Sequence, residues 1–305
     1  MPAVDINRGT TNVLLPAEVS AEIWGATLEE SAFMRLARRI NMPGSGVDIQ
    51  TITGEPSADW VDETALKPVA THTFGKKTIR PYKLAVIEPF SNEFRRDKAA
   101  LYNELVRRLP FALAKKFDNT IMGSTAPGTG FDVLGSATKV SLNPASGKTV
   151  YDQFITIDGT IAAADGIMNG IALAPQGKSK VLAAVDGQQR PLFTPGVGSN
   201  TVGDILGSPV YVTKGVYVAG AAGSPGTPAI VGVAGDFSDA VWGSVEGIQM
   251  AISDQATLAV GSGASASTIN LWQQNMFAVR VEIEIAFAVK NINEFVLLTG
   301  DTPSA

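Results

Sequence analysis

The sequence predicts an α+β fold in which an α/β domain is inserted into a second domain. Three observations support this prediction. Every odd position of the stretch 277–289 is apolar while its charged residues fall on even positions, which is the alternation of a long strand with one buried face. Apolar residues recur at every fourth position over 101–121, which indicates a long helix. Between these two stretches, residues 151–260 alternate short apolar runs with helical patterns, as mixed α and β structure does.

Composition limits the kinds of site that the chain can form. None of its 305 residues is cysteine, which excludes disulfides and thiolate metal sites, and its one histidine is His72. No basic segment followed by an apolar one opens the chain, and no apolar run reaches the roughly 18 residues of a membrane span. We therefore expect a soluble protein made in the cytosol, with no membrane partner.

Charge is divided unevenly along the chain. Residues 1–122 carry 16 Lys and Arg against 15 Asp and Glu, whereas residues 123–305 carry 8 against 14. Binding to phosphate groups depends mainly on Lys and Arg, so any contact with nucleic acid is expected from the first part of the chain.

The N-terminal part predicts an arm followed by a helix. Residues 1–15 are polar and short of helix formers. Pro16 then opens a helical pattern with acidic residues in its first turns, and three arginines between positions 35 and 39 lie where the helix dipole favours cations. We expect a helix over 16–40.

The next segment predicts a long β-hairpin. Alternating apolar residues mark two strands, Val47–Ile52 and Thr78–Ile87, and a polar stretch of about 25 residues joins them. Loops of that length in ordered proteins tend to be functional. This one is either a solvated surface ribbon or an arm that lies on a neighbouring subunit.

Residues 92–122 form the strongest helical segment. A proline inside a helix costs about 3 kcal/mol, so we expect a kink or the start of a second helix at Pro110, and we expect Gly123 to end the segment. The stretch 124–150 is rich in Gly, Pro, Ser and Thr and predicts a domain boundary. Basic residues give the exposed side of the helix a positive charge, the usual composition of a solvated face: Arg95, Arg96, Lys98, Arg107, Arg108, Lys115 and Lys116.

The following domain alternates helices and strands before a flexible joint at 261–265. The predicted helices span 151–165 and 179–186, and the predicted strands span 170–175, 207–212, 229–236 and 247–252.

No catalytic constellation emerges from the residues. His72 lies in the polar loop of the hairpin, where a surface position is the ordinary interpretation. The tetrapeptide Gln176–Ser179 is similar to the end of a P-loop, but Ala172 stands where the first glycine of that motif should be. We expect a strand-to-helix turn there, with no cofactor and no metal. The four tryptophans are scattered and predict packing anchors: Trp24, Trp60, Trp242 and Trp272.

The order of these parts, together with several local segments, resembles the major capsid protein of tailed double-stranded DNA bacteriophages of the Hong Kong 97 type. Ala58–Glu63 is similar to a segment of that family's extended loop, and Phe111–Gly123 to the end of its spine helix. Leu206–Val210 and Gly235–Phe237 look like turns of its axial domain, and Asn275–Glu282 resembles its return strand.

The resemblance implies a Hong Kong 97-like capsid fold with an N-terminal arm, an extended β-hairpin loop, a peripheral domain with a long spine helix and a long return strand, and an inserted α/β axial domain. The boundaries expected on this basis are 1–42 for the arm and its helix, 43–89 for the extended loop, 90–150 and 265–305 for the peripheral domain, and 151–264 for the axial domain.

The resemblance also implies a structural function without catalysis: self-assembly as pentamers and hexamers into an icosahedral shell that encloses double-stranded DNA. The protein would then be part of the virion and assemble in the host cytoplasm. Its implied partners are further copies of itself, a separate scaffolding protein, a portal and packaged DNA bound without sequence preference, with a decoration protein as a further candidate.

Two groups of residues are candidates for these contacts. Those expected between subunits are Trp60, Glu63, Ile79, Tyr82, Leu84, Val86, Arg280, Glu282 and Glu284. Those expected on an interior basic face are Arg95, Arg96, Arg107, Arg108, Lys115 and Lys116.

Some relatives join a loop lysine to an asparagine of a neighbour, and the candidates here are Lys67, Lys76 and Lys77 with Asn291 and Asn293. Three other functions remain open on the sequence: an encapsulin-like nanocompartment shell, a nucleotide-binding enzyme of the P-loop kind, and a β-rich adhesin or tail protein.

Overall fold

The computed structural model describes a large part of the chain. The described residues are 27, 31–53, 59–63, 66–67, 69, 73–93, 98–145, 147–185, 188, 190–193, 203–223, 225–260 and 267–303. For 51–53, 73–74, 98–107 and 110 the description is of the backbone alone. Within these ranges no helix combines the length and the apolar character needed to cross a membrane.

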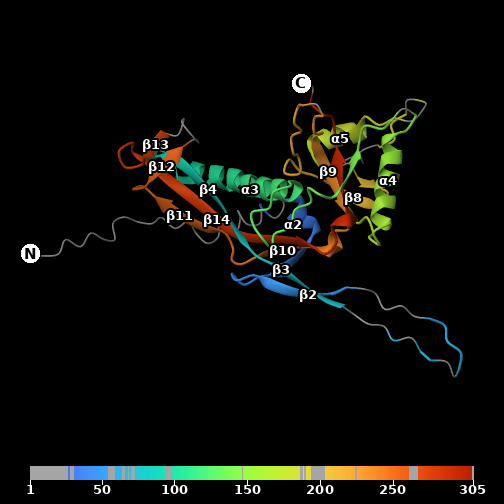
Figure 1. Cartoon of the computed structure of the whole chain (residues 1–305). Coiled ribbons are helices and arrows are strands. Elements are labelled where there is room, and N and C mark those ends of the chain that lie inside the picture. The colour runs from blue at the N-terminus through green and yellow to red at the C-terminus, as the bar shows by residue number, and fades with distance from the viewer. Residues whose placement is uncertain are drawn as a thin grey trace, which may run out of the picture.

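The strand β14 (Met276–Val289) organises a five-stranded sheet. It pairs antiparallel with β4 along one edge and with β10 and β11 along the other, and β1 pairs with β10 in parallel (Figure 1). Every odd-numbered side chain from Phe277 to Val289 is buried, which confirms the predicted strand. The opposite face is charged only in its middle, from Arg280 to Glu284, because Ala278, Ala286 and Ala288 are also buried. The partner strands are β1 (Arg38–Asn41), β4 (Tyr82–Ser91), β10 (Ala240–Ser244) and β11 (Gln249–Ser253).

The helix predicted over 16–40 ends earlier than expected. The structure has a short helix, α2 (Ala32–Leu36), with Ser31 as its N-cap. Arg38 and Arg39 then belong to β1 instead of the last turn of a helix. The reason is a tertiary contact: residues 38–41 pair with β10, about two hundred positions further along the chain. This pairing overrides the local helix propensity of the segment.

The predicted hairpin is present as β2 (Val47–Thr53) and β3 (Thr73–Ile79), paired in register along their whole length. The segment Thr78–Ile87, predicted as one strand, is two. Pro81 cannot donate to a ladder, and the N–H of Arg80 donates to the carbonyl of Gly130 at 2.9 Å. The chain therefore leaves the hairpin after β3 and enters the five-stranded sheet as β4. His72 lies outside the described residues.

The long helix is α3 (Lys98–Met122), which runs beside β4 and β14 in Figure 1. It passes through Pro110 as one helix, so the predicted start of a second helix there is wrong. It also begins later than expected, because Ser91 still belongs to β4 and the N–H of Asn92 donates to the carbonyl of Asn275. The predicted buried stripe is confirmed at four positions: Leu109, Leu113, Phe117 and Ile121.

A second sheet has six strands in the order β5-β15-β9-β6-β8-β7. One face packs against the helices α4 and α5, and the other packs against the core of the first sheet. Neighbouring residues of these strands alternate between the two cores, as Val233 and Ala234 of β9 and Leu297 and Leu298 of β15 show. The strands are β5 (Thr138–Ser141), β6 (Gly170–Leu173), β7 (Asp204–Ile205), β8 (Ser208–Val212), β9 (Ile230–Gly235) and β15 (Phe295–Thr299). The helices are α4 (Val150–Ala162) and α5 (Pro175–Leu182).

Strand pairing divides the chain differently from the expected domain ranges. β10 and β11 fall within 151–264, yet both pair with β14 in the first sheet. β5 and β15 fall within 90–150 and 265–305, yet both belong to the six-stranded sheet. Each of the two sheets therefore contains strands from both expected domain ranges. Within the described residues there are also a small hairpin of β12 (Thr257–Val260) and β13 (Ser267–Asn270) and the short helical turns η2 (Phe237–Asp239) and η4 (Ile292–Glu294).

Candidate inter-subunit surfaces

The base of the β2–β3 hairpin is fixed to the end of β14. The ammonium of Lys77 forms an ion pair with Asp132 at 2.5 Å and also donates to the carbonyl of Val289. Asp132 in turn accepts from the N–H of Val289 at 2.9 Å and donates its own N–H to the carbonyl of Phe287 at 2.9 Å. Asp132 thus occupies the edge of β14 beyond the end of β4. The hairpin is anchored by a half-buried charge pair at its base.

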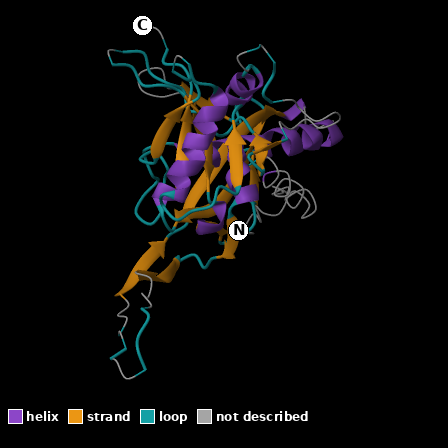
Figure 2. Cartoon of the chain, turned by 90° about the vertical axis from the view of Figure 1, so that its right-hand side faces the viewer, coloured by secondary structure: helices purple, strands orange, loops and turns teal. Residues whose placement is uncertain are grey.

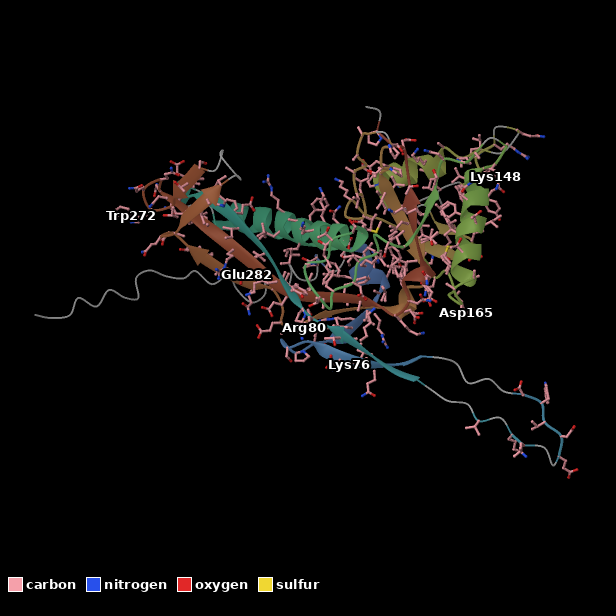
Figure 3. All side chains as sticks on the ribbon, in the orientation of Figure 1. Lys76, Arg80, Lys148, Asp165, Trp272 and Glu282 are labelled. Atoms are coloured by element: carbon pink, nitrogen blue, oxygen red, sulfur yellow. The ribbon has the colours of Figure 1, made fainter. Side chains whose placement is uncertain are left out.

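Two glycines permit the chain to approach the hairpin base closely. Gly46 has a φ of 87°, and a Cβ there would lie 2.3 Å from the carbonyl oxygen of Ile79. Gly130 has a φ of 83° and lies against Arg80, whose position at the base is seen in Figure 3. These contacts set the direction in which the hairpin leaves the body.

The far end of the hairpin, which we call the hairpin tip (residues 59–63, 66, 67 and 69), is exposed. Figures 1 and 2 show it projecting away from both sheets. Trp60 is 104% exposed, Leu66 98% and Val69 88%. Three acidic residues of the same segment are also exposed: Asp59, Asp62 and Glu63. Large apolar side chains grouped in this way on a surface are typical of a site that another molecule covers.

The other apolar candidates for contacts between subunits lie inside their own chain. Ile79 is 1% exposed, packed with the residues under the hairpin base. Leu84 and Val86 lie in β4 and are partly buried against the main core. Tyr82 donates its hydroxyl to the carbonyl of Thr129 at 2.8 Å. Of the predicted set, only Trp60 offers a fully exposed apolar side chain.

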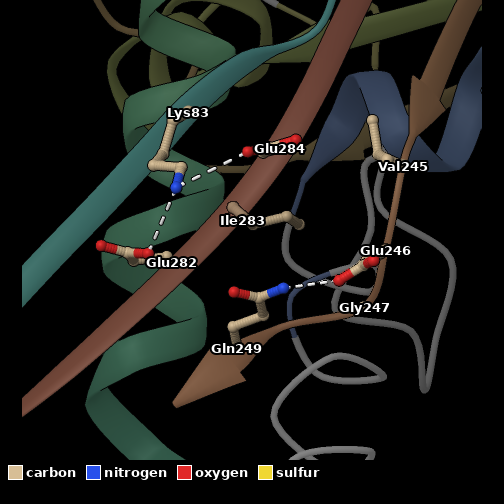
Figure 4. Close-up of a pocket in the computed structure, with 8 residues that line it drawn as sticks. All are labelled: Lys83, Val245, Glu246, Gly247, Gln249, Glu282, Ile283 and Glu284. Carbon is tan, nitrogen blue, oxygen red and sulfur yellow. Dashed lines mark hydrogen bonds and ion pairs between the residues drawn. The ribbon is translucent and has the colours of Figure 1, made fainter. Parts of the chain in front are cut away.

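The charged candidates form ion pairs within the chain. Lys83 of β4 lies between Glu282 and Glu284 of β14, at 3.4 and 3.6 Å (Figure 4). Arg280 pairs with Glu282 at 3.1 Å. Glu246 lies across the same small cavity of about 130 Å³. This is a cross-strand ladder of alternating charge, of the kind that stabilises neighbouring strands modestly.

The basic face expected on the long helix is present in part. Lys115 and Lys116 are exposed, and Arg108 is exposed with Glu88 at 3.8 Å. The side chain of Arg107 and the residues Arg95 and Arg96 lie outside the described part of the chain.

The candidates for a covalent link differ in availability. Lys77 is held in the hairpin anchor, and Lys76 pairs with Asp48 at 2.8 Å. Asn291 caps η4, accepting from the N–H of Asn293 and donating to Glu294. Lys67 and Asn293 are exposed, and no described contact brings them together.

The P-loop-like tetrapeptide lies inside a helix. α5 begins at Pro175, so Gln176–Ser179 forms its first turns, one turn earlier than predicted. A Cβ on Gly177 would lie 2.5 Å from the carbonyl oxygen of Val231, so this glycine lets α5 pack directly onto β9. Among the residues described, no three His, Cys, Asp or Glu side chains gather as metal ligands would.

Sequence reasoning missed a buried carboxylate on the long helix. Asp118 accepts from the hydroxyl of Ser31 at 2.6 Å and from the N–H of Ala32 at 3.0 Å. Complete burial raises the pKa of Asp118 to about 7, and the hydrogen bonds from Ser31, Ala32 and Phe33 oppose that rise. The signal that could have found it is an acidic residue directly beside the apolar stripe. Asp118 joins α2, the first described helix, to α3.

The tryptophans divide into two groups. Trp242 is buried and donates its Nε1–H to the carbonyl of Met34 at 3.1 Å, as a packing anchor would. Trp60 and Trp272 are exposed, so the prediction that they are packing anchors is wrong for the isolated chain. Trp24 lies outside the described residues.

The chain is similar to known proteins over nearly its whole length. Residues 11–300 match the phage capsid family. The chain is 32% identical over 296 residues to a probable major capsid protein of Mycobacterium phage D29, covering 94% of this chain and 90% of the relative. A probable major capsid protein of Mycobacterium phage L5 is 32% identical over 301 residues, covering 94% and 89%. A solved chain from Gordonia phage Cozz has the same fold, with a TM-score of 0.67, 20% identity, and coverage of 90% of this chain and 87% of that one.

Proposed function

Because the chain belongs to the phage capsid family, we propose that it assembles through pentamers and hexamers into an icosahedral shell that encloses double-stranded DNA. It is a structural capsid protein, as its match over nearly the whole length and its similarity to major capsid proteins indicate. The proposal concerns how the subunits are arranged in the shell and what the shell contains.

The observation that carries the proposal is the hairpin tip. Trp60, Leu66 and Val69 are almost fully exposed on a ribbon that extends beyond the body. Burial of apolar surface contributes about 25 cal/mol per Å², so a partner that covers these side chains gains free energy. In a closed shell the same contact is repeated at every subunit, and many weak contacts add up to a stable particle.

The exposed cations of α3 support contact with the packaged DNA. Arg108, Lys115 and Lys116 are exposed on the same helix, and a row of Lys and Arg screens phosphate charge without reading sequence. We propose that this face lines the interior. A scaffolding protein and a portal would take part in assembly, and a decoration protein is a further candidate for the outer surface.

Electron microscopy of the purified product tests the proposal. The chain is expressed together with the other structural genes of the phage that carries it, and closed shells are expected. The matched control replaces residues 54–72 by a two-residue Asn-Gly turn, which should leave a protomer of unchanged melting temperature that forms no shells. Small oligomers alone from the unaltered chain would overturn the shell, and normal shells from the shortened chain would overturn the role of the hairpin.

A further inference from the structure

We propose that Glu294 and Asp239 share one proton and thereby form a pH-sensitive clasp across the two turns that join the sheets. We call these two side chains the carboxyl clasp. Loss of the shared proton leaves two facing carboxylates, whose repulsion loosens the turns and lets the two sheets change their mutual orientation. This inference goes beyond the proposed function, because it concerns a single chain.

The chain passes between the two sheets twice at the same place. β9 continues through η2 into β10, and β14 continues through η4 into β15 (Figure 1). β9 pairs with β15 and β10 pairs with β14, so the two passages run side by side as an antiparallel ribbon. Regular pairing stops between these two ladders, where residues 236–239 face residues 290–294. The ribbon can therefore bend at the two turns.

Backbone hydrogen bonds hold the two turns together. The N–H of Lys290 donates to the carbonyl of Asp239 at 3.0 Å, and the N–H of Asp236 donates to the carbonyl of Glu294 at 3.1 Å. The carboxylate of Asp236 is occupied by donors from its own turn and from the loop after α4. The acids that face each other across the turns are Asp239 and Glu294.

Glu294 has one carboxyl oxygen without a donor. The residue is 6% exposed, and its Oε1 accepts from the side-chain amide of Asn291 at 3.0 Å. Its Oε2 is buried and accepts no hydrogen bond within the described part of the chain. The acid in hydrogen-bonding contact with Glu294 is Asp239. Two ionised carboxylates are both acceptors, so this contact becomes a hydrogen bond only when one of the acids carries a proton.

The environments of the two acids assign the proton to Glu294. Lys290 forms an ion pair with Asp239 at 3.1 Å, which supplies Asp239 with a counter-ion. Glu294 is covered by the loop after α4, where a Cβ on Gly166 would lie 2.9 Å from its side chain. Burial disfavours the charged form of an acid, so the more deeply buried carboxyl group keeps the proton.

The other charged groups around the clasp lie toward solvent. Arg38 of β1 and Lys77 of β3 line a groove of about 420 Å³ together with Asp239 and Lys290. On the side of α4, the charged residue next to the covering loop is Asp165, and it is exposed. The side chain of Asp239 is a quarter exposed, so the groove gives the shared proton a path to solvent.

The direction of the pH effect follows from these contacts. Burial raises the pKa of Glu294, the charge of Asp239 raises it further, and Asn291 and Lys290 oppose the rise. A group whose pKa is raised on folding stabilises the folded arrangement below its ordinary pKa. The clasp is therefore complete below about pH 4.5 and is lost as the pH rises through the raised pKa of Glu294.

Amide hydrogen exchange at several pH values tests the clasp in the full chain. In the unaltered chain, protection of the N–H groups of Asp236 and Lys290 should fall by up to about tenfold per pH unit above pH 4.5, until the raised pKa is passed. Glu294→Gln, whose amide can donate to Asp239 at every pH, should keep this protection constant. The amide of Ile283 in the middle of β14 is the internal reference, because global unfolding exposes it as well.

A second acid on a neighbouring element provides the matched control. Asp158→Asn neutralises an exposed carboxylate of α4 and should behave like the unaltered chain. Protection at Asp236 and Lys290 that only follows protection at Ile283, or that falls equally in Glu294→Gln, overturns the clasp.

A direct titration covers the case in which Glu294→Gln does not fold. The carboxyl carbon of Glu294 is followed by NMR in the unaltered chain and in two variants. Asp239→Asn removes the neighbouring negative charge and should lower the midpoint of the titration, whereas Lys290→Met removes the opposing cation and should raise it. Shifts in the same direction, or no shift with either variant, contradict a proton shared between the two acids.

Fluorescence energy transfer tests whether the clasp sets the orientation of the sheets. The chain contains no cysteine, so Lys139→Cys on β5 and Ser253→Cys on β11 place one dye on an exposed position of each sheet. The distribution of transfer efficiencies should be narrow at pH 4.5 and broaden above the raised pKa of Glu294, and with Glu294→Gln it should stay narrow. A distribution that is the same at both pH values in the unaltered chain overturns the change in orientation.

Discussion

The aromatic core around Phe287 and the hairpin tip around Trp60 place large aromatic side chains in opposite environments. Phe287 is fully buried, and the rings of Phe33, Phe117 and Phe131 lie 5.4, 6.4 and 6.4 Å from its own, centre to centre. Trp60 is fully exposed at the end of the hairpin. The core is thus completed within one chain, whereas the tip is left for a partner to cover. Changes in the first should affect the stability of the protomer, and changes in the second should affect assembly.

The largest expected effect tests this division at its extremes. Phe287→Ala should lower the free energy of unfolding by about 3–5 kcal/mol, because it leaves a cavity among three other rings. Trp60→Ala should change it by less than about 0.5 kcal/mol, because the side chain is fully exposed in the free chain. Urea unfolding of the dilute protomer measures both. A loss at Trp60 comparable to that at Phe287 would mean that the tip folds onto its own body in solution.

The second effect concerns the buried carboxyl group of Asp118 inside the core. Burial raises the pKa of Asp118 to about 7 in the folded chain, from about 4 when unfolded. The folded state then holds a proton that the unfolded state has lost, so stability falls as the pH rises from about 4 to 7. The loss is at most about 1.4 kcal/mol per pH unit.

Carboxylates whose pKa is lowered in the folded chain, such as those of Asp152 and Asp236, make the protein more stable as the pH rises, which opposes the effect of Asp118. Comparison with Asp118→Asn isolates the contribution of Asp118, because the other carboxylates are the same in both proteins. Between pH 4 and 7, the free energy of unfolding of the variant should fall less with rising pH than that of the unaltered chain, or should rise. The readout is the difference in slope, since the amide also loses one acceptor for the N–H of Ala32. Parallel profiles would show that folding does not raise the pKa of Asp118.

The third effect lies at the junction between core and hairpin. Asp132→Ala leaves the half-buried Lys77 without its counter-ion and the N–H of Val289 without its acceptor. Loss of such contacts costs roughly 1–3 kcal/mol. Amide hydrogen exchange should quicken at Val289 and along β3. Asp48→Ala, which removes the exposed partner of Lys76 and the acceptor of the Thr78 hydroxyl but touches neither Lys77 nor Val289, is the control and should leave exchange at Val289 unchanged.

Local patterns predicted the elements that bury one continuous face. The alternation over 277–289 and the apolar spacing on the long helix specify burial residue by residue, and both were confirmed. The helix α4 and the strand β6 were also placed close to their observed positions. In each case the signal lies within the element itself.

The errors occur where distant residues decide the structure. Period-two alternation shows that β11 is a strand, but its pairing with β14 depends on residues about thirty positions away. The same holds for β1, which resembled the end of a helix until β10 supplied its partner. The groove between the base of the hairpin and the first sheet is lined by residues of β2, β3, β10 and β14, so no local pattern could predict it.

The smallest expected effect separates a stabilising ladder from an assembly contact. Lys83→Met removes the cation between Glu282 and Glu284. The side chain of Lys83 is half exposed in these ion pairs. Exposed pairs contribute about 0.2–1 kcal/mol, so the unfolding free energy should fall by no more than that, and the difference should shrink at high salt. The protein concentration needed for assembly should stay the same, because in the unaltered chain both glutamates form their ion pairs within their own chain. If assembly weakened while the protomer kept its stability, the charged face of β14 would be a subunit contact and the division between core and hairpin would have to include it.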